Sequence, residues 1–260
     1  MKKIIFLDLD GTLWTFEQIP SSALEAIELA RKNGHKIYIN TGRTRCEVPQ
    51  FLLGLNFDGY CFGAGSEIII DNKQMLFKPL EKRDTKFIQH IAKDTGHSLE
   101  GSQMTFTSEK NRERMRKFHV DNRMGNRFLS FPDISEITDK DYEQIMKISI
   151  HFDSTAQREE ILKQIPEHLT FTNFMHLGGE ITHKEYNKAT AIQFVKDYYN
   201  EEYETVAIGD SENDLTMLNY ADISVAMGNG VDCVKEKADY VTDKIDNDGL
   251  YKAFKYLKLI

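Results

Sequence analysis

The stretch IIFLDLDGT, residues 4–12, decides the fold of this chain of 260 residues. Its first four residues are apolar and partly β-branched, which is typical of a strand buried on both faces of a parallel sheet. Side chains alternate along a strand, so Asp8 and Asp10 point to the same side, and Gly11 and Thr12 then turn the chain sharply. The stretch therefore predicts two carboxylates held side by side at the end of a first strand.

Strand and helix alternate along both ends of the chain. Ser21 and Ser22 are candidate N-caps of a helix that follows the first strand, and Gly34 stands where a helix C-terminal cap is expected. The other expected elements are strands at 36–40, 60–62, 205–208, 223–226 and 240–242 and helices at 48–53, 189–199 and 212–219. This alternation predicts an α/β fold with a parallel sheet, to which both ends of the chain contribute.

The pattern changes between these two ends. The expected elements there are charged helices at 84–94 and 155–165 and alternating strands at 147–152, 169–174 and 179–182. Such a mixture indicates an inserted α+β domain. We expect a core domain over residues 1–78 and 185–260 and an inserted domain over residues 79–184.

The charge of the chain limits its partners. Lys and Arg number 33 against 41 Asp and Glu, which gives a formal net charge of −8. That charge repels nucleic acid and anionic membranes, so neither is expected as a partner. A phosphorylated metabolite is repelled as well, and its site would need local positive charge from a metal ion, a lysine or helix N-termini.

The cysteines and the N-terminus bear on the compartment. Cys46, Cys61 and Cys233 lie far apart without the spacing of metal ligands, so neither a disulfide framework nor a zinc site is expected. Asp8 and Asp10 interrupt the N-terminal apolar run, which leaves it too short for a signal peptide or a spanning helix. We expect the protein to be in the reducing cytoplasm.

A second acidic stretch, GDSEND at residues 209–214, follows another expected strand. In open α/β sheets the ligand crevice lies beyond the carboxyl ends of the strands, where Asp8, Thr41 and Asp210 are all expected. Aspartate beside glycine is also ordinary turn chemistry, and Thr41 could equally cap a helix. Carboxylates gathered in one crevice repel one another, so they imply a bound cation, and an all-oxygen ligand set favours magnesium over zinc.

Four motifs, taken in order, resemble those of the haloacid dehalogenase superfamily of phosphatases, in its branch of Cof-type, subclass IIB sugar-phosphatase-like hydrolases. The motifs are Asp8-Leu9-Asp10-Gly11-Thr12, Thr41-Gly42-Arg43, Lys188 in Tyr186-Asn187-Lys188-Ala189, and Gly209-Asp210 with Asn213-Asp214. The resemblance extends over the whole chain. It implies a Rossmann-like, doubly wound core with an inserted C2-type cap.

The resemblance also implies a role for each motif residue. Asp8 would be the nucleophile that forms an aspartyl phosphate, and Asp10 would be the general acid and then the general base. Magnesium would be held by the carboxylates of Asp8 and Asp210 and the backbone carbonyl of Asp10, with Asp214 in support. The phosphoryl oxygens would be bound by the remaining groups, namely the backbone N–H groups of Leu9 and Gly42, the hydroxyl of Thr41, the ammonium of Lys188 and the amide of Asn213.

The implied activity is hydrolysis of a small phosphorylated metabolite, by a monomer or weak homo-oligomer whose cap chooses the substrate. A phosphomutase of the same superfamily and a catalytically silent phosphate-binding module are the alternatives. Glu180 is either a cap residue that faces the site or an exposed strand carboxylate, and Trp14 either lines the pocket mouth or packs in the core. Lys188 could otherwise be a solvated helix residue.

Overall fold

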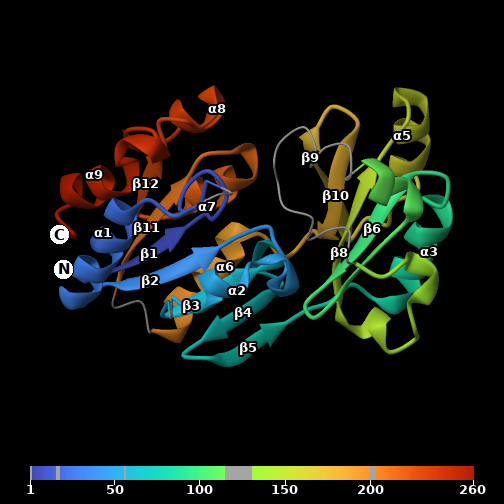
Figure 1. Ribbon diagram of the computed structural model, residues 1–260, viewed down its shortest axis with the longest axis horizontal. Coiled ribbons are helices and arrows are strands. Elements are labelled where there is room, and N and C mark those ends of the chain that lie inside the picture. The colour runs from blue at the N-terminus through green and yellow to red at the C-terminus, as the bar shows by residue number, and fades with distance from the viewer. Residues whose placement is uncertain (1, 16–17, 56, 115–130, 200–202) are drawn as a thin grey trace. The chain divides into compact units, whose positions relative to one another are not determined.

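The computed structural model describes residues 2–15, 18–55, 57–114, 131–199 and 203–260 (Figure 1). These residues fall into two compact units. The larger unit comprises Met1–Gly42, Gln50–Phe77 and Tyr186–Ile260, and the smaller unit comprises Arg43–Pro49 and Lys78–Glu185. The two ends of the chain therefore belong to one unit.

The described part of the larger unit is built on an eight-stranded sheet, in the order β13-β12-β11-β1-β2-β3-β4-β5. The strands are β1 (Lys3–Leu7), β2 (Lys36–Asn40), β3 (Gly59–Phe62), β4 (Glu67–Ile70), β5 (Lys73–Phe77), β11 (Glu204–Gly209), β12 (Ile223–Ala226) and β13 (Tyr240–Val241). Strand β1 pairs in parallel with β2 on one side and with β11 on the other. The first strand expected from the sequence, which ends next to Asp8, thus lies in the middle of the sheet.

Helices and short 3-10 turns connect these strands. They are α1 (Ser21–Lys32), α2 (Gln50–Leu53), η2 (Gly63–Gly65), α6 (Lys188–Tyr198), η6 (Glu212–Asp214), α7 (Leu215–Tyr220), α8 (Asp232–Lys235), η7 (Ile245–Asn247) and α9 (Gly249–Tyr256). The expectation that Ser21 and Ser22 cap α1 is wrong: both are helical residues, and the N-cap is Pro20, whose carbonyl accepts the N–H of Ala23 at 3.0 Å. The C-terminal cap at Gly34 is confirmed, with φ of 85° and an N–H bonded to the carbonyl of Arg31 at 2.9 Å.

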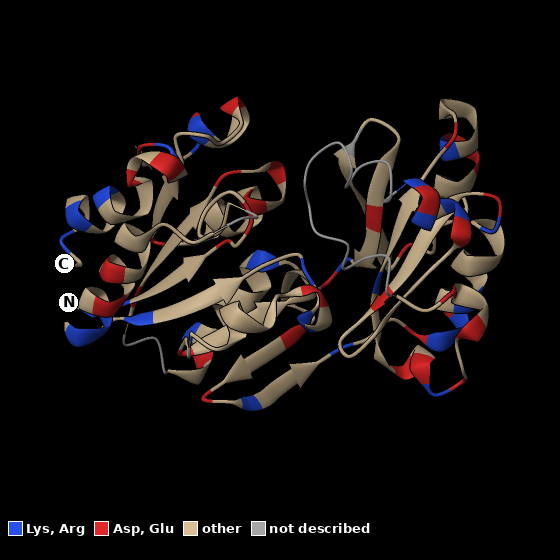
Figure 2. Ribbon diagram, viewed as in Figure 1, with Lys and Arg blue, Asp and Glu red and all other residues tan. Residues whose placement is uncertain are grey.

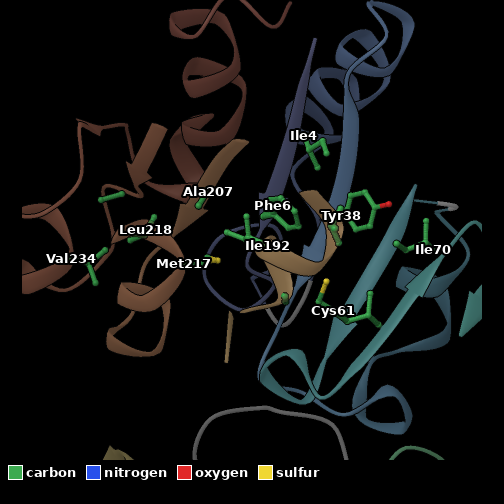
Figure 3. Packing of buried hydrophobic residues seen from close by; sticks show 14 residues of the cluster. Ile4, Phe6, Tyr38, Cys61, Ile70, Ile192, Ala207, Met217, Leu218 and Val234 are labelled. Atoms are coloured by element: carbon green, nitrogen blue, oxygen red, sulfur yellow. The ribbon is translucent and has the colours of Figure 1, made fainter. Parts of the chain in front are cut away.

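Strand β1 is buried on both of its faces. Ile4 and Phe6 belong to a cluster with Tyr38 and Ile192, and side chains of α6 and α7 complete it (Figure 3). Ile5 alternates to the opposite face and is also 0% exposed. An apolar run without alternation is what such a strand requires, because both of its faces are removed from water.

A hairpin extends the sheet beyond β3. Strand β4 is antiparallel to β3, and β5 is antiparallel to β4. The turn between β4 and β5 places Asp71 and Asn72 at φ values of 49° and 62°, a left-handed backbone that these two residue types tolerate well. The predicted α/β class is confirmed by this mixed sheet with its flanking helices, and the hairpin adds antiparallel strands to its edge.

The smaller unit is an antiparallel sheet with helices. Its described strands, in the order β7-β6-β8-β10-β9, are β6 (Gly96–Gly101), β7 (Thr105–Thr107), β8 (Ile145–His151), β9 (Leu169–Met175) and β10 (Gly178–His183). Its helices and 3-10 turns include η1 (Arg45–Glu47), α3 (Lys82–Ile91), η4 (Ile134–Glu136), η5 (Asp141–Gln144) and α5 (Thr155–Leu162). One apolar cluster joins Ile88 of α3 to Leu99, Ile148 and Ile181 of the sheet.

A buried group of charged side chains in the smaller unit centres on Lys147. Its ammonium lies 3.0 Å from a carboxylate oxygen of Glu100, 2.9 Å from Glu180 and 3.8 Å from Glu47. Of the two alternatives for Glu180, an exposed strand carboxylate is wrong, because its side chain is only 14% exposed. Burial and the charge of Glu47 raise the pKa of Glu100 to about 7, because three carboxylates share one ammonium.

The pKa of Glu100 makes stability depend on pH. Between the ordinary value of 4.5 and about 7, folded protein holds a proton that the unfolded chain has released, so stability falls as pH rises through this window. In the wild type, this decrease in the free energy of unfolding amounts to at most about 3 kcal/mol. We expect the decrease to be smaller in Glu100→Gln. Urea unfolding at pH 5 and pH 7 measures it. Glu160→Gln, an exposed carboxylate on α5, should leave the slope unchanged, and a wild-type slope retained in Glu100→Gln would contradict the assignment.

The helices of the described residues can be compared with what a membrane span requires and examined for their charge. None of the helices there combines the length and the apolar character needed to cross a membrane. Figure 2 shows basic and acidic residues interspersed along the helices of each unit.

Candidate active site

The ends of three neighbouring parallel strands bring the first motif residues together. Asp8 directly follows β1, and its N–H donates to the carbonyl of Ile208 in β11 at 3.0 Å. Thr41 directly follows β2, and its N–H donates to the carbonyl of Cys61 in β3 at 2.9 Å. Asp210 directly follows β11. Because these strands are parallel, all three motif residues lie at one edge of the sheet, as expected.

Lys188 is the first residue of α6 and lies at this same edge of the sheet. The helix begins with Asn187 as N-cap, whose side chain accepts the backbone N–H groups of Ala189 and Thr190 at 2.9 and 3.1 Å. The amide of Asn40, at the end of β2, donates to the carbonyl of Lys188 at 2.9 Å. Asn40 is 0% exposed. It was not identified from the sequence as a site residue, although a polar residue at the end of an apolar strand was a signal for one.

The ammonium of Lys188 bridges two carboxylates. It donates to Oδ1 of Asp8 and to Oδ1 of Asp214, each at 2.5 Å. All three residues are buried, with Lys188 itself 1% exposed. The alternative of a solvated lysine is therefore wrong, since this side chain is the counter-ion of the predicted nucleophile.

Asp214 organises the loop that carries Asp210. Its Oδ2 accepts the backbone N–H groups of Asp210 and Ser211, at 2.9 and 3.0 Å. Glycine is required at position 209, because a Cβ there would lie 2.5 Å from Cγ of Asp214. Both oxygens of Asp214 thus have donors within the protein, which suits a supporting role.

The turn after Asp10 packs against Asp210. Gly11 has φ of 78°, and a Cβ on it would lie 2.4 Å from Oδ2 of Asp210. The hydroxyl of Thr12 donates to Oδ1 of Asp210 at 3.3 Å. The Asp-Gly-Thr sequence therefore fits this turn for steric reasons as well as chemical ones.

The acidic groups of the site repel one another. Asp8, Asp210 and Asp214 each place a carboxylate oxygen so that the three atoms lie within 4.8 Å of one another. Burial, and then the charge of Asp214, raise the pKa of Asp8 well above its usual range and that of Asp210 to about 6. Burial alone would lower the pKa of Lys188, but the charges of Asp214 and Asp8 outweigh it and raise the value.

This charge balance favours a further cation. Three carboxylates face one ammonium, and a cation among them would relieve the repulsion that raises two of the pKa values. The available ligands are oxygens only, and a hard divalent ion such as magnesium prefers those. The residues present therefore fit the metal expected from the sequence.

The remaining predicted residues lie around this cluster in different ways. Leu9 and Asp10 share the turn with Asp8, and Leu9 is 1% exposed while Asp10 is half-buried. Gly42 follows the buried Thr41 at the end of β2. Asn213 is exposed, and its Oδ1 accepts a hydrogen bond from the hydroxyl of Ser211 at 2.8 Å. The contacts given above for Asp8, Lys188, Asp210 and Asp214 do not include this side chain.

Trp14 has a packing role. Its side chain is 9% exposed and meets the ring of Phe51 edge-on, with centroids 6.2 Å apart and an interplanar angle of 75°. Of the two alternatives for Trp14, the structure supports packing in the larger unit.

The chain belongs to the haloacid dehalogenase-like hydrolase family, whose sequence model matches residues 5–254. A relative from Bacillus subtilis (strain 168), the 5-amino-6-(5-phospho-D-ribitylamino)uracil phosphatase YcsE, is 31% identical over 98% of this chain and 95% of its own. Among solved structures, the HAD subclass IIB sugar phosphatase BT4131 is 27% identical, with a TM-score of 0.83 over 100% of both chains. BT1666 from Bacteroides thetaiotaomicron, in the same superfamily, is 28% identical, with a TM-score of 0.84 over 100% of this chain and 96% of its own.

These similarities confirm the resemblance drawn from the four motifs. The chain belongs to a hydrolase family, and its relatives are phosphatases, so it is a phosphatase that acts on phosphorylated substrates. The fold class expected from the sequence is confirmed by the same structures.

Proposed function

We propose that the chain hydrolyses phosphomonoesters of small metabolites with the help of magnesium, through an aspartyl phosphate on Asp8. The observation that carries the proposal is the buried contact of Asp8 with Lys188 at the carboxyl edge of the sheet, beside Asp210 and Asp214. A carboxylate held in this way has one oxygen fixed by the ammonium. Its second oxygen is then the one to attack phosphorus.

Asp8 performs the covalent step. One of its oxygens forms a bond to phosphorus while the bond from phosphorus to the leaving oxygen breaks. Asp10 protonates the leaving oxygen, then takes a proton from the water whose oxygen attacks the phosphorus of the aspartyl phosphate. Inorganic phosphate leaves and Asp8 is regenerated as a carboxylate.

The other site residues hold the phosphoryl group. Lys188 supplies positive charge, Thr41 a hydroxyl, and Leu9 and Gly42 backbone N–H groups, while Asn213 would have to turn its amide from Ser211 to join them. Magnesium would be held by the carboxylates of Asp8 and Asp210 and the carbonyl of Asp10, with Asp214 in support. When bound it neutralises charge on the phosphoryl oxygens.

The proposed substrate class is supported by the relatives. We propose a small phosphorylated metabolite, and the substrate named for YcsE, a phosphorylated ribitylaminouracil, belongs on the panel with sugar phosphates. We further propose that residues 79–184 act as a C2-type cap that selects among such compounds. The net charge of −8 and the scarcity of cysteine support a cytoplasmic enzyme without nucleic-acid partners, acting as a monomer or weak homo-oligomer.

The test is release of inorganic phosphate from p-nitrophenyl phosphate and from the panel, with magnesium and with chelator. Magnesium-dependent release is the expected result. Isomerisation of a sugar phosphate without release would indicate a phosphomutase instead, and binding of phosphate without either reaction would indicate a silent module.

Metal binding can be measured without turnover. Magnesium at about one hundred times its dissociation constant should stabilise the wild type by about 2.7 kcal/mol and raise Tm by about 5 °C or more. Asp210→Asn should lose most of this response. Asp222→Asn, which removes a carboxylate that accepts from Thr205 at 2.8 Å, should keep it. An equal magnesium response in wild type and Asp210→Asn would contradict the ligand set.

A further inference from the structure

One side chain outside the four motifs connects the turn after Asp8 to a distant loop. Asn229 lies between β12 and α8, and its Nδ2 donates to the carbonyl of Gly11 at 2.8 Å, although the two residues are 218 positions apart. Its Oδ1 accepts the backbone N–H of Ile245 at 2.9 Å. A single carboxamide thus joins the C-terminal turn η7 to the turn of the first motif.

The two peptide groups flanking Gly11 are held separately. The N–H of Gly11 donates to the carbonyl of Trp14 at 2.9 Å. Because a peptide group is planar, this bond also fixes the direction of the carbonyl of Asp10. The bond from Asn229 fixes the next peptide group, which leads to Thr12 and its contact with Asp210. Together they restrict rotation at a glycine that has no side chain to limit it.

We propose that Asn229 is a positioning residue for the phosphatase reaction, which keeps the turn that carries Asp10 in one conformation. The inference rests on the proposed function, in which Asp10 moves the protons. Without the bond, the peptide after Gly11 rotates and Asp10 shifts relative to Asp8. A displacement of about 1 Å in such a group lowers turnover by as much as about a hundredfold.

The chemistry of the two bonds explains why an amide stands at this position. A carboxamide has both a donor and an acceptor, as the carbonyl of Gly11 and the N–H of Ile245 require. Aspartate still accepts the N–H of Ile245, but its second oxygen cannot donate to the carbonyl oxygen of Gly11 and is repelled by it. Since Asn229 is exposed, Asn229→Asp breaks one bond without disturbing the core.

The matched control is Asn33→Asp in the same unit. The amide of Asn33 donates to the carbonyl of Leu259 at 2.8 Å, which is also a long-range bond from an asparagine to a backbone oxygen. Asn33 lies at the end of α1, next to residues that lead into the amino end of β2. Its loss should therefore leave the catalytic turn unchanged.

The experiment measures kcat and KM for p-nitrophenyl phosphate together with hydrogen exchange of the amides at residues 11–14 in the absence of substrate. Asn229→Asp should lower kcat about tenfold to a hundredfold, change KM less than threefold, and speed exchange in the turn. Asn33→Asp should change neither. Unchanged exchange, or faster exchange with wild-type kcat, would overturn the role of Asn229. Absence of hydrolysis by the wild type would contradict the proposed function instead, and exchange would still decide whether Asn229 holds the turn.

Discussion

Asp8→Asn is expected to lower phosphate release by at least about 10⁴-fold, because asparagine cannot attack phosphorus and no aspartyl phosphate forms. The other proposed phosphate-binding groups, Lys188 among them, are unchanged, so the loss should appear in kcat. Phosphate release from p-nitrophenyl phosphate under saturating magnesium measures it. Activity within tenfold of the wild type would contradict the role of Asp8 as nucleophile.

The same variant should fold well. Burial and neighbouring charge raise the pKa of Asp8, which means that its negative charge is unfavourable where it lies in the metal-free protein. The neutral asparagine removes that cost, so in chelator the variant should unfold at the wild-type temperature or above it. Asp222→Asn is the control with full activity expected, since this carboxylate accepts from Thr205 at the start of β11.

Lys188→Met is expected to impair both stability and turnover. The change removes two ion pairs of 2.5 Å and leaves the carboxylates of Asp8 and Asp214 buried without their cation. Loss of one partner in such a group costs about 3–5 kcal/mol of the free energy of unfolding. Turnover should fall by about 10²–10³-fold, because the phosphoryl group loses its fixed positive charge.

A lysine on the same helix provides the control for this second variant. Lys196 lies near the end of α6, and its ammonium is 3.5 Å from a carboxylate oxygen of Asp222 whose side chain is 41% exposed. A partly exposed pair of this kind contributes at most about 1 kcal/mol, so Lys196→Met should change stability little and activity not at all. Equal effects of the two substitutions, measured by urea unfolding in chelator and by kcat, would rule out the bridging role of Lys188.

Strand β1 and its neighbours could be predicted because their signals are local. An apolar run that ends in Asp8 and Asp10 predicts a buried strand with acidic residues at its carboxyl end, and the structure has both. Parallel strand order then places Thr41 and Asp210 at the same edge without any knowledge of their contacts. This reasoning needs only side-chain periodicity and sheet topology.

Contacts between distant residues could not be predicted in the same way. Lys188 and Asp8 are 180 positions apart, and nothing in the sequence near Lys188 reports that its ammonium is buried. Asn40 was missed because its partner is a backbone carbonyl of α6. Every helix has such carbonyls, so the sequence does not show which one is the partner. The β4–β5 hairpin did have a local signal, since Asp71 and Asn72 separate two apolar runs in a form typical of a two-residue turn.

The smaller unit shows the same limit. The segment Arg43–Pro49 begins at the last residue of the second motif, yet it belongs to the smaller unit. The thiol of Cys46 donates to the carbonyl of Gly101 at 3.2 Å, and Glu47 lies 3.8 Å from the buried ammonium of Lys147. From the sequence alone, polar side chains at these positions are predicted to be exposed, because their burial depends on partners from other strands.

The most direct test of the account is to trap the covalent intermediate. Wild-type enzyme mixed with substrate and magnesium is quenched in acid and reduced with borohydride, which converts an aspartyl phosphate to homoserine. Homoserine is expected at position 8 in the peptide spectrum when substrate is present, and aspartate when substrate is omitted. Phosphate release without modification at Asp8, or homoserine at another aspartate, would contradict this expectation.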